Sequence, residues 1–379
     1  MTRKNFRLAT LLTVPALLCA LTLSMAFAAA GGKDAKPAAP GKGKIDKKLE
    51  ADIMARVQEF LKHRFSAVIK SVKPGAAKVG KPIPITVDVA FDDKRAIDKI
   101  AEVKIYYSTD GGEKWMRPVS LKKSGAAWSG NIPQQKAPGS LMYYTWVKDS
   151  YGKVTVELPC KVSTWPPADD KCMVNGAVDE DPKDDPTSKV PNNLDFWGFK
   201  VGMDDNYIYL QQTVEGSVTK GTTNPTNINS YMFAIFDVGL AKEIDDITAI
   251  MQPGAAATKF KGKENMVWMG IYSPLAKAYM PGVKKDCFMP RAAAGKPKGK
   301  EPQMPDMNTT MVECKSKGPD LFIRVKKQGM ASSMKSQVAL MGGITMAVTD
   351  TQNLMNGIKF GDFMNMTRAV MNPRTLKIN

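Results

Sequence analysis

The stretch VKIYYSTDGGEKW, residues 103–115, carries the clearest β signal in this chain. Apolar side chains alternate with more polar ones between residues 103 and 108, as in a strand that rests one face on a core. The Asp-Gly-Gly sequence at 110–112 is typical of a tight turn, because glycine tolerates positive φ angles. The stretch therefore predicts a strand that ends in a turn.

The same period of two continues on both sides, from residue 66 to residue 163. Strands are predicted at residues 67–72, 83–91, 100–108, 114–121, 126–132, 141–148 and 153–162. Short strands spaced by about ten residues are typical of a β-sandwich of immunoglobulin or fibronectin type III size. Together with AWSGNIP at 127–133 and YYTWVKDS at 143–150, the opening stretch resembles the immunoglobulin-like domains of bacterial surface and secreted proteins. The resemblance implies a fold and no activity.

A second strand-rich region begins with PNNLDFWGFKVGMDDNYIYL, residues 191–210, which predicts two strands joined by an Asp-Asp-Asn turn. Further strands are expected at residues 230–237, 266–272, 311–315, 320–326, 337–349 and 366–378. With its leucine–aspartate strand, its Tyr-Ile-Tyr-Leu strand and the closing RTLKI at 374–378, the region resembles the family 9 carbohydrate-binding-module-like sandwich, a relative of DOMON domains. The resemblance implies a jelly-roll-type sandwich that binds sugar or, in the DOMON branch, sugar or haem.

The whole chain is thus predicted to be all-β, with two β-sandwich domains, immunoglobulin-like and then family-9-like, preceded by a short amphipathic helix. The expected segments are a signal peptide at 1–28, a flexible basic linker at 29–47, the amphipathic helix at 48–65, the immunoglobulin/fibronectin type III-like sandwich at 66–163, an acidic, proline-rich junction at 164–190 and the larger sandwich at 191–379. Two domains fit a chain of 379 residues, because domains usually hold about 100 to 200 residues.

Residues 1–28 have the three parts of a secretory signal peptide. Basic residues precede an apolar stretch at 8–23, and an Ala-Phe-Ala cleavage site ends at Ala28. The apolar stretch is shorter than the about 20 residues of a membrane span. The alternative is a lipoprotein that is acylated at Cys19. Such a site needs a small residue directly before the cysteine, but here that residue is Leu18. We therefore expect an exported protein (periplasmic, cell-surface or extracellular) that is not transmembrane after cleavage and is at most peripheral to the envelope.

Four cysteines remain after cleavage, at Cys160, Cys172, Cys287 and Cys314. In an oxidising compartment an even number of cysteines favours disulfides. Of the three pairings, the one between sequence neighbours joins Cys160 to Cys172 and Cys287 to Cys314. The first disulfide would link the end of the first sandwich to the start of the next domain, and the second would close a basic loop. A four-cysteine zinc site would need paired C-x-x-C spacings, which are absent.

Acidic residues outnumber lysines in the junction, although the chain as a whole carries a net charge of +17. Closely spaced carboxylates repel one another unless a cation or solvent screens them, so Asp179, Asp181 and Asp195 are candidates for a calcium site. A solvated acidic loop is the alternative, because no EF-hand spacing is present. The 24 methionines form clusters that suit Cu(I), but flexible methionines also fill sandwich cores. No histidine pattern or Cys-x-x-Cys-His motif supports haem.

The resemblance to family 9 modules, which clamp sugar between aromatic faces, makes the strand aromatics of the second region candidate ligand-binding residues. They are Trp197, Tyr207, Tyr209, Trp268 and Tyr272. Alternation places Trp268 and Tyr272 on one face of their strand. A strand aromatic that faces inward belongs to the core instead, and this alternative stays open.

Basic residues gather at 284–300 and 315–327, which favours an anionic partner such as lipopolysaccharide, an acidic exopolysaccharide or a protein. Nucleic acid is not expected for an exported protein. The single histidine and the lack of phosphate-loop, nucleophile-elbow or zinc-protease motifs argue against an enzyme. We expect a non-catalytic binding protein that recognises a glycan or polysaccharide through its C-terminal sandwich. The alternatives are a structural or assembly protein that docks to another envelope protein, and a haem- or copper-binding redox module.

Overall fold

The computed structural model describes residues 62–177, 191–218, 228–239, 267–274, 276–279, 284–291, 306–348 and 358–379. In these ranges most residues lie in β-strands, with a short helix α7 (Ala276–Tyr279) and a 3-10 helix η2 (Ser332–Lys335). None of the described helices is long and apolar enough to cross a membrane. The all-β prediction is confirmed, whereas the signal peptide, the linker and most of the expected amphipathic helix lie outside the described residues.

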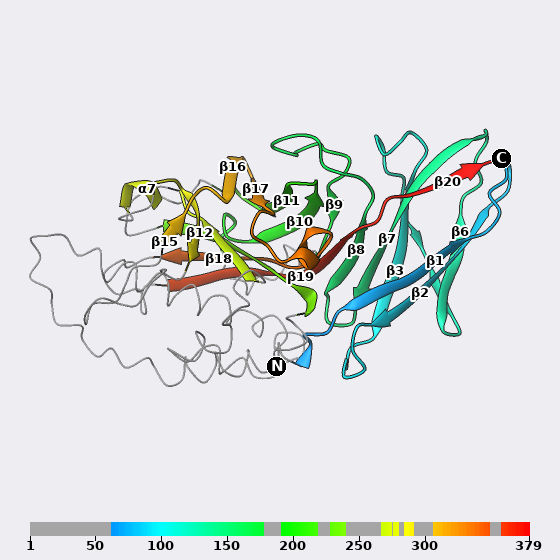
Figure 1. Ribbon diagram of the computed structural model, residues 1–379, viewed down its shortest axis with the longest axis horizontal. Helices are drawn as coiled ribbons and strands as arrows, with labels where there is room; N and C mark the ends of the chain where they lie inside the picture. Colours follow the sequence, from blue (N-terminus) through cyan, green and yellow to red (C-terminus); the bar gives the residue numbers. More distant parts are fainter. Residues whose placement is uncertain are drawn as a thin grey trace, which may run out of the picture.

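The first sandwich has a four-stranded sheet in the order β1-β2-β6-β5, packed against strands of a second sheet (Figure 1). The four strands are β1 (Ala67–Pro74), β2 (Ile83–Phe91), β6 (Ala127–Ile132) and β5 (Lys122–Ser124). Facing them are β3 (Ile100–Ser108), β4 (Val119–Ser120), β7 (Gly139–Asp149) and β8 (Val154–Leu158). Ile83 and Ile85 of β2 share a core with Val103 and Ile105 of β3, because alternate residues of a strand lie on one face.

The second sandwich packs a five-stranded sheet, in the order β16-β17-β11-β10-β9, onto part of an 11-stranded sheet. The five strands are β16 (Val312–Lys317), β17 (Asp320–Lys326), β11 (Tyr207–Val214), β10 (Phe196–Met203) and β9 (Val174–Asn175). The facing strands are β15 (Asp306–Asn308), β14 (Cys287–Arg291), β13 (Val267–Tyr272), β12 (Ile228–Phe236), β18 (Gln337–Val348) and β19 (Ile358–Met371). β10 and β11 form the predicted hairpin.

The 11-stranded sheet continues from one sandwich into the other, because β19 pairs in parallel with β8. After Asn372 and Pro373, the final strand β20 (Arg374–Ile378) pairs with β7, as the red strand in Figure 1 shows. The sequence predicted a single strand at 366–378 within the second sandwich, but residues 374–378 complete the first one. Alternation shows which residues of a strand face a core and leaves open which strand will be its partner.

Strand β7 is buried on both faces and separates two hydrophobic cores. Tyr143 and Val147 face the core of the first sandwich. Tyr144 and Trp146 belong to the larger core, which the second sandwich shares with Leu158 and other residues of β8. The near-continuous apolar run at 143–147 is typical of a strand covered on both sides. The two sandwiches are therefore joined by a common wall as well as by the chain.

Two disulfides are present, between Cys160 and Cys172 and between Cys287 and Cys314. They confirm the pairing of sequence neighbours. Disulfides persist in oxidising compartments, so they indicate an exported environment.

Candidate binding surface

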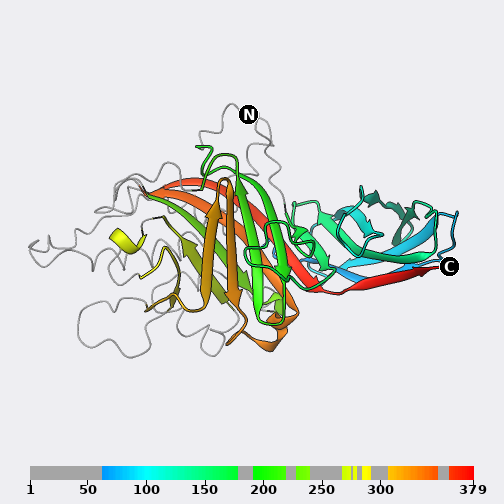
Figure 2. The same cartoon turned by 90° about the horizontal axis from the view of Figure 1, so that it is seen from above.

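The five-stranded sheet turns one face to the core and the other away from it. Ile208 and Leu210 of β11 and Ile323 and Val325 of β17 are core residues. Their alternates and cross-strand partners lie on the opposite face. We call this opposite face the outer face; it is formed by Lys200, Gly202, Tyr207, Tyr209, Gln211, Thr213, Glu313, Lys315, Lys317, Asp320, Phe322 and Arg324. Figure 2 shows the green β10 and β11 and the brown-orange β16 and β17 lying over the longer sheet.

An aromatic cluster around Arg324 occupies one end of the outer face. The guanidinium carbon lies 4.7 Å from the ring centroid of Trp165 and 4.7 Å from that of Tyr207. Nη2 of Arg324 also pairs with Oε2 of Glu313 at 2.7 Å. A guanidinium stacks well on aromatic faces, because the cation meets the negative side of each ring. The cluster thus holds Trp165, a residue of the linker between the sandwiches, against the sheet.

Tyr209 lies beneath this cluster and is 4% exposed. Its hydroxyl donates a hydrogen bond of 2.6 Å to Oδ2 of Asp204. Burial, this hydrogen bond and the nearby carboxylate raise the pKa of Tyr209 well above its usual range. Tyr209 is therefore a neutral, buried part of the hairpin, whereas its neighbour Tyr207 is half-buried against Arg324.

The loop closed by Cys160 and Cys172 covers this same end. A Cβ atom at Gly202 would lie 2.7 Å from Sδ of Met173, so glycine permits the close approach of the loop to β10. Asp170 organises the loop by accepting backbone hydrogen bonds from Ser163 at 2.8 Å and Cys172 at 2.9 Å. The covered end is thus a structural joint. Burial continues into the middle of the outer face, where Gln211 is 6% and Phe322 1% exposed, and Nζ of Lys315 lies 5.8 Å from the ring centroid of Trp165.

Trp197 is a predicted ligand-binding residue that the structure places at the surface. The register of β10 and β11 shifts between Phe196 and Gly198, so Trp197 is the extra residue of a β-bulge. It is 60% exposed. The bulge lies next to the row of the outer face in which Gly198 pairs with Thr213, which places the indole beside that face.

Trp268 and Tyr272 share one face of β13, as expected, but that face is the core. Trp268 is 5% and Tyr272 8% exposed, and both belong to the larger hydrophobic core. The hydroxyl of Tyr272 lies 3.2 Å from Oγ of Ser316. The structure therefore brings Tyr207 and Tyr209 together, leaves Trp197 exposed at the bulge, and places Trp268 and Tyr272 in the interior.

The structure describes only one of the three candidate metal-binding aspartates. Asp179 and Asp181 lie outside the described residues, and Asp195 is half-buried just before β10. Among the described residues, no group of three His, Cys, Asp or Glu side chains is placed to hold a metal ion. Met330, Met334 and Met366, which the sequence grouped into clusters, are buried, the position expected of core methionines.

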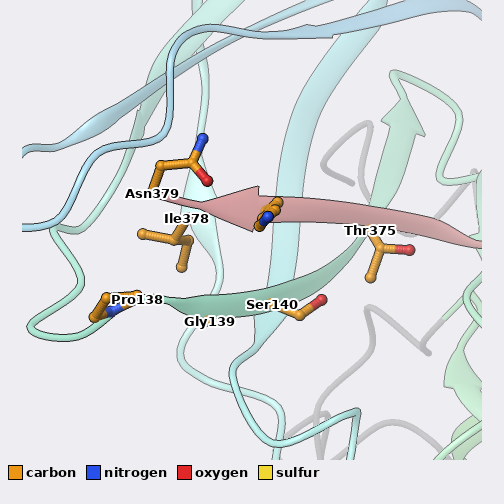
Figure 3. Close-up of a pocket in the computed structure, with 7 residues that line it drawn as sticks. Pro138, Gly139, Ser140, Thr375, Ile378 and Asn379 are labelled. Carbon is orange, nitrogen blue, oxygen red and sulfur yellow. The ribbon is translucent and has the colours of Figure 1, made fainter.

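An open depression of about 800 Å³ lies at the other end of the molecule, between the ends of β7 and β20 (Figure 3). Pro138, Ser140, Thr375 and Asn379 are among its lining residues, and Lys377 is the charged side chain there. Its lining offers no aromatic ring or acidic side chain, so it lacks both a stacking platform and a carboxylate pair.

The contribution of Trp165 was missed from the sequence, where this residue lies in the acidic, proline-rich junction and was not a candidate. The available signal was chemical: a tryptophan in a polar linker needs a partner surface to be stable. Arg324 was noted as part of a basic run, but its position between two rings depends on which strands pair.

A scan of protein-family models and a search of curated proteins find no match to this chain. Among solved structures, it is matched to trypsin-activated α2-macroglobulin from Escherichia coli, with 8% sequence identity and a TM-score of 0.17. The match covers 83% of this chain but spans only 16% of that protein's chain. A similarity this low carries no argument about fold or function.

Proposed function

We propose that this is an exported, non-catalytic binding protein that recognises a polysaccharide on the outer face of its five-stranded sheet. The observation that carries the proposal is the 60% exposure of Trp197 beside that face. Folding normally buries an indole of this size, so its exposure at a bulge favours a role in recognition.

The burial of most of the strand aromatics argues against a sugar clamped between two rings. Three of the aromatics expected to bind a ligand, Tyr209, Trp268 and Tyr272, are buried, so they are not accessible to a sugar. An indole presents an apolar ring face to the C–H groups of a sugar and an N–H donor to its hydroxyls. The sheet around Trp197 adds polar side chains, including Lys200 and Thr213, for hydrogen bonding.

A glycan array tests this proposal with the mature protein and two variants. Trp197→Ala removes the exposed indole and should abolish binding to every glycan recognised by the parent. Ile97→Ala is the matched control, because Ile97 is also 60% exposed but lies outside the second sandwich. Binding that survives Trp197→Ala would contradict the proposal, and so would silence of the parent protein across neutral and acidic polysaccharides.

A second candidate function is docking to another envelope protein. The observation that favours it is the exposure of Ile97 and Met116, at 60% and 42%, on the first sandwich. Each is a large apolar side chain that a protein partner would remove from water. If the array is silent, Ile97→Asp should prevent co-purification with an envelope partner, while Trp197→Ala should leave it intact.

A further inference from the structure

The C-terminal strand β20 forms an edge of its sheet, because it pairs with β7 and with no other described strand. Successive residues of a strand direct their backbone N–H and C=O groups to opposite sides. The N–H of Asn379 donates to the carbonyl of Ala77 at 3.1 Å, and the N–H of Val79 donates to the carbonyl of Asn379 at 3.0 Å. Asn379 therefore faces away from β7. By alternation, Thr375 and Lys377 face away from β7 as well.

The register of β7 gives the same assignment independently. The N–H of Thr145 donates to Oε2 of Glu157 on β8 at 3.2 Å, so the odd-numbered residues of β7 face the side of β8. β20 lies on that side too, because β3 occupies the other side of β7. Tyr143 and Leu141 therefore hydrogen-bond to their partners on β20, and the partner of Leu141 is Leu376. The residues on either side of Leu376 in the sequence must face outward.

Thr375 and Lys377 thus form what we call the free edge of β20. Both residues are exposed, and in the described part of the chain no hydrogen bond reaches their backbone groups from this side. The free edge offers the N–H and the C=O of each residue to an added strand. It is short, about 10 Å along the strand, because Asn379 is already bonded and Pro373 lacks an N–H.

The two faces of β20 differ along the free edge. Thr375 and Lys377 line the depression together with Ser140 of β7 (Figure 3). A Cβ atom at Gly139 would meet no atom within 4 Å, so this side of the strands is open. Leu376 points to the opposite face, where it is half-buried and packs against the core of the first sandwich. An added strand would therefore place two side chains at the depression and the side chain between them beside Leu376.

The side chains of the free edge restrict which strand can be added. An exposed lysine on an edge strand normally opposes pairing with another sheet. An acidic side chain opposite Lys377 removes this obstacle, because opposite charges stabilise a cross-strand pair and like charges destabilise it. An apolar side chain opposite Leu376 would cover the half-buried leucine. A second copy does not fit in the register that pairs Thr375 with Lys377, since its Pro373 would have to lie where residues 77–79 contact Asn379.

We infer that the free edge of β20 binds an extended segment of a partner protein as an added strand, with an acidic residue opposite Lys377 and an apolar residue opposite Leu376. In complexes of this kind, main-chain hydrogen bonds give affinity and alternate side chains give specificity. The inference goes beyond polysaccharide recognition, because the free edge lies on the first sandwich. Its failure would leave the proposed polysaccharide site unaffected.

The probe is a fluorescent peptide with the core Glu-Val-Glu, which places a carboxylate opposite Lys377 in either strand direction. Fluorescence anisotropy with the whole protein should show binding. Thr375→Pro removes an outward N–H and no ladder bond to β7, so it should weaken binding at least about tenfold. Thr375→Ala is the matched control, because it keeps that N–H and should bind as the parent does. Equal thermal unfolding temperatures of the variants show that each is folded.

A charge exchange tests the choice of partner. Lys377→Glu should weaken binding of the Glu-Val-Glu peptide at least about fivefold, and a Lys-Val-Lys peptide should bind this variant more tightly than it binds the parent. Lys122→Glu is the matched control, an exposed lysine on β5 at the far side of the first sandwich. It changes the net charge by the same amount and should leave the binding of both peptides unchanged.

Amide hydrogen exchange locates the binding site. In the free protein the N–H groups of Thr375 and Lys377 should exchange faster than that of Leu376, and bound peptide should slow them. The inference is overturned if the Glu-Val-Glu peptide does not bind, if Thr375→Pro binds it as tightly as Thr375→Ala, or if Lys122→Glu weakens binding as much as Lys377→Glu. It is also overturned if sedimentation shows a dimer that Thr375→Pro dissociates, because a second copy would then occupy the edge.

Discussion

Glu157 is a buried carboxylate, 2% exposed, at the boundary between the two sandwiches. Its Oε1 accepts hydrogen bonds from Nη2 of Arg374 at 2.7 Å and Nδ2 of Asn372 at 2.7 Å. The backbone N–H of Thr145 donates to its Oε2 at 3.2 Å. These donors replace the water that the carboxylate loses on folding, and two of them come from the last residues of the chain. The C-terminus is thus fixed to the molecule by a residue of β8.

Arg374→Met should lower the free energy of unfolding by about 3 to 5 kcal/mol, because it leaves a buried carboxylate without its cation. Urea unfolding measures the change. The control is Lys161→Met, which removes an exposed pair with Asp205 at 2.8 Å and should have no measurable effect. A loss below about 1 kcal/mol for Arg374→Met would contradict the prediction.

Asp170 makes the disulfide loop sensitive to pH. Burial raises the pKa of its carboxyl, but hydrogen bonds from Ser163, Thr164 and Cys172 outweigh burial, so the pKa is lowered overall. Because the pKa of this carboxyl is lower in the folded than in the unfolded protein, the ionised carboxylate stabilises the fold at pH values above the unfolded pKa of about 3.9. This stabilisation is lost as the pH falls through the folded pKa. Asp170→Asn should therefore be less stable than the parent at pH 6, with a difference that shrinks below about pH 3.9.

Thermal unfolding at a series of pH values tests this prediction, with Asp169→Asn as the control. Asp169 is the exposed neighbour of Asp170, so its variant should follow the parent at every pH. A difference between Asp170→Asn and the parent that is constant from pH 6 to pH 2 would contradict the prediction.

At the scale of elements, β20 is the strand whose role differs most from its place in the sequence. It follows β19 of the second sandwich, yet Ile378 is 3% exposed in the core of the first. Ile378→Ala should cost about 2 to 5 kcal/mol, as truncation of a buried isoleucine usually does. Thr375→Ala on the exposed side of the same strand should change stability little. Equal unfolding midpoints for the two variants would show that β20 does not pack as described.

Most strands could be predicted from the sequence, because their alternation is a local property. The predicted ranges 83–91, 100–108 and 320–326 coincide with β2, β3 and β17. The prediction of a strand at residues 114–121 was wrong, since only Val119–Ser120 forms a strand there. The partners of β8 and β20 depend on contacts between residues far apart in sequence, which periodicity does not encode. For the same reason, the sequence identified five aromatic candidates but did not distinguish the exposed Trp197 from the buried Trp268.

At the scale of the molecule, the common wall of β7 and β8 makes the two sandwiches depend on each other. Tyr144 and Leu158 belong to the core of the second sandwich, so either unit alone would expose apolar surface. We expect one calorimetric unfolding transition, shifted as a whole by Ile378→Ala in the first sandwich. Two separable transitions, of which only one responds to Ile378→Ala, would contradict this coupling.

The joint between the sandwiches is held by several contacts of different kinds. Nε1 of Trp115 donates to the carbonyl of Lys171 at 3.0 Å, and Arg324 is stacked between Trp165 and Tyr207. The disulfide of Cys160 and Cys172 closes the loop that carries Trp165 and Lys171. These contacts fix the position of the five-stranded sheet, so its outer face is a rigid surface that loses little conformational entropy on binding.

The most direct test of the central claim is oxidative footprinting of the protein with and without a polysaccharide that binds it on the glycan array. The indole of Trp197 and the thioether of Met116 are both exposed, on the second and the first sandwich respectively, and both react readily with hydroxyl radicals. We predict that saturating polysaccharide slows the oxidation of Trp197 and leaves the oxidation of Met116 unchanged. Equal oxidation of Trp197 with and without bound polysaccharide would contradict the assignment of this face as the binding surface.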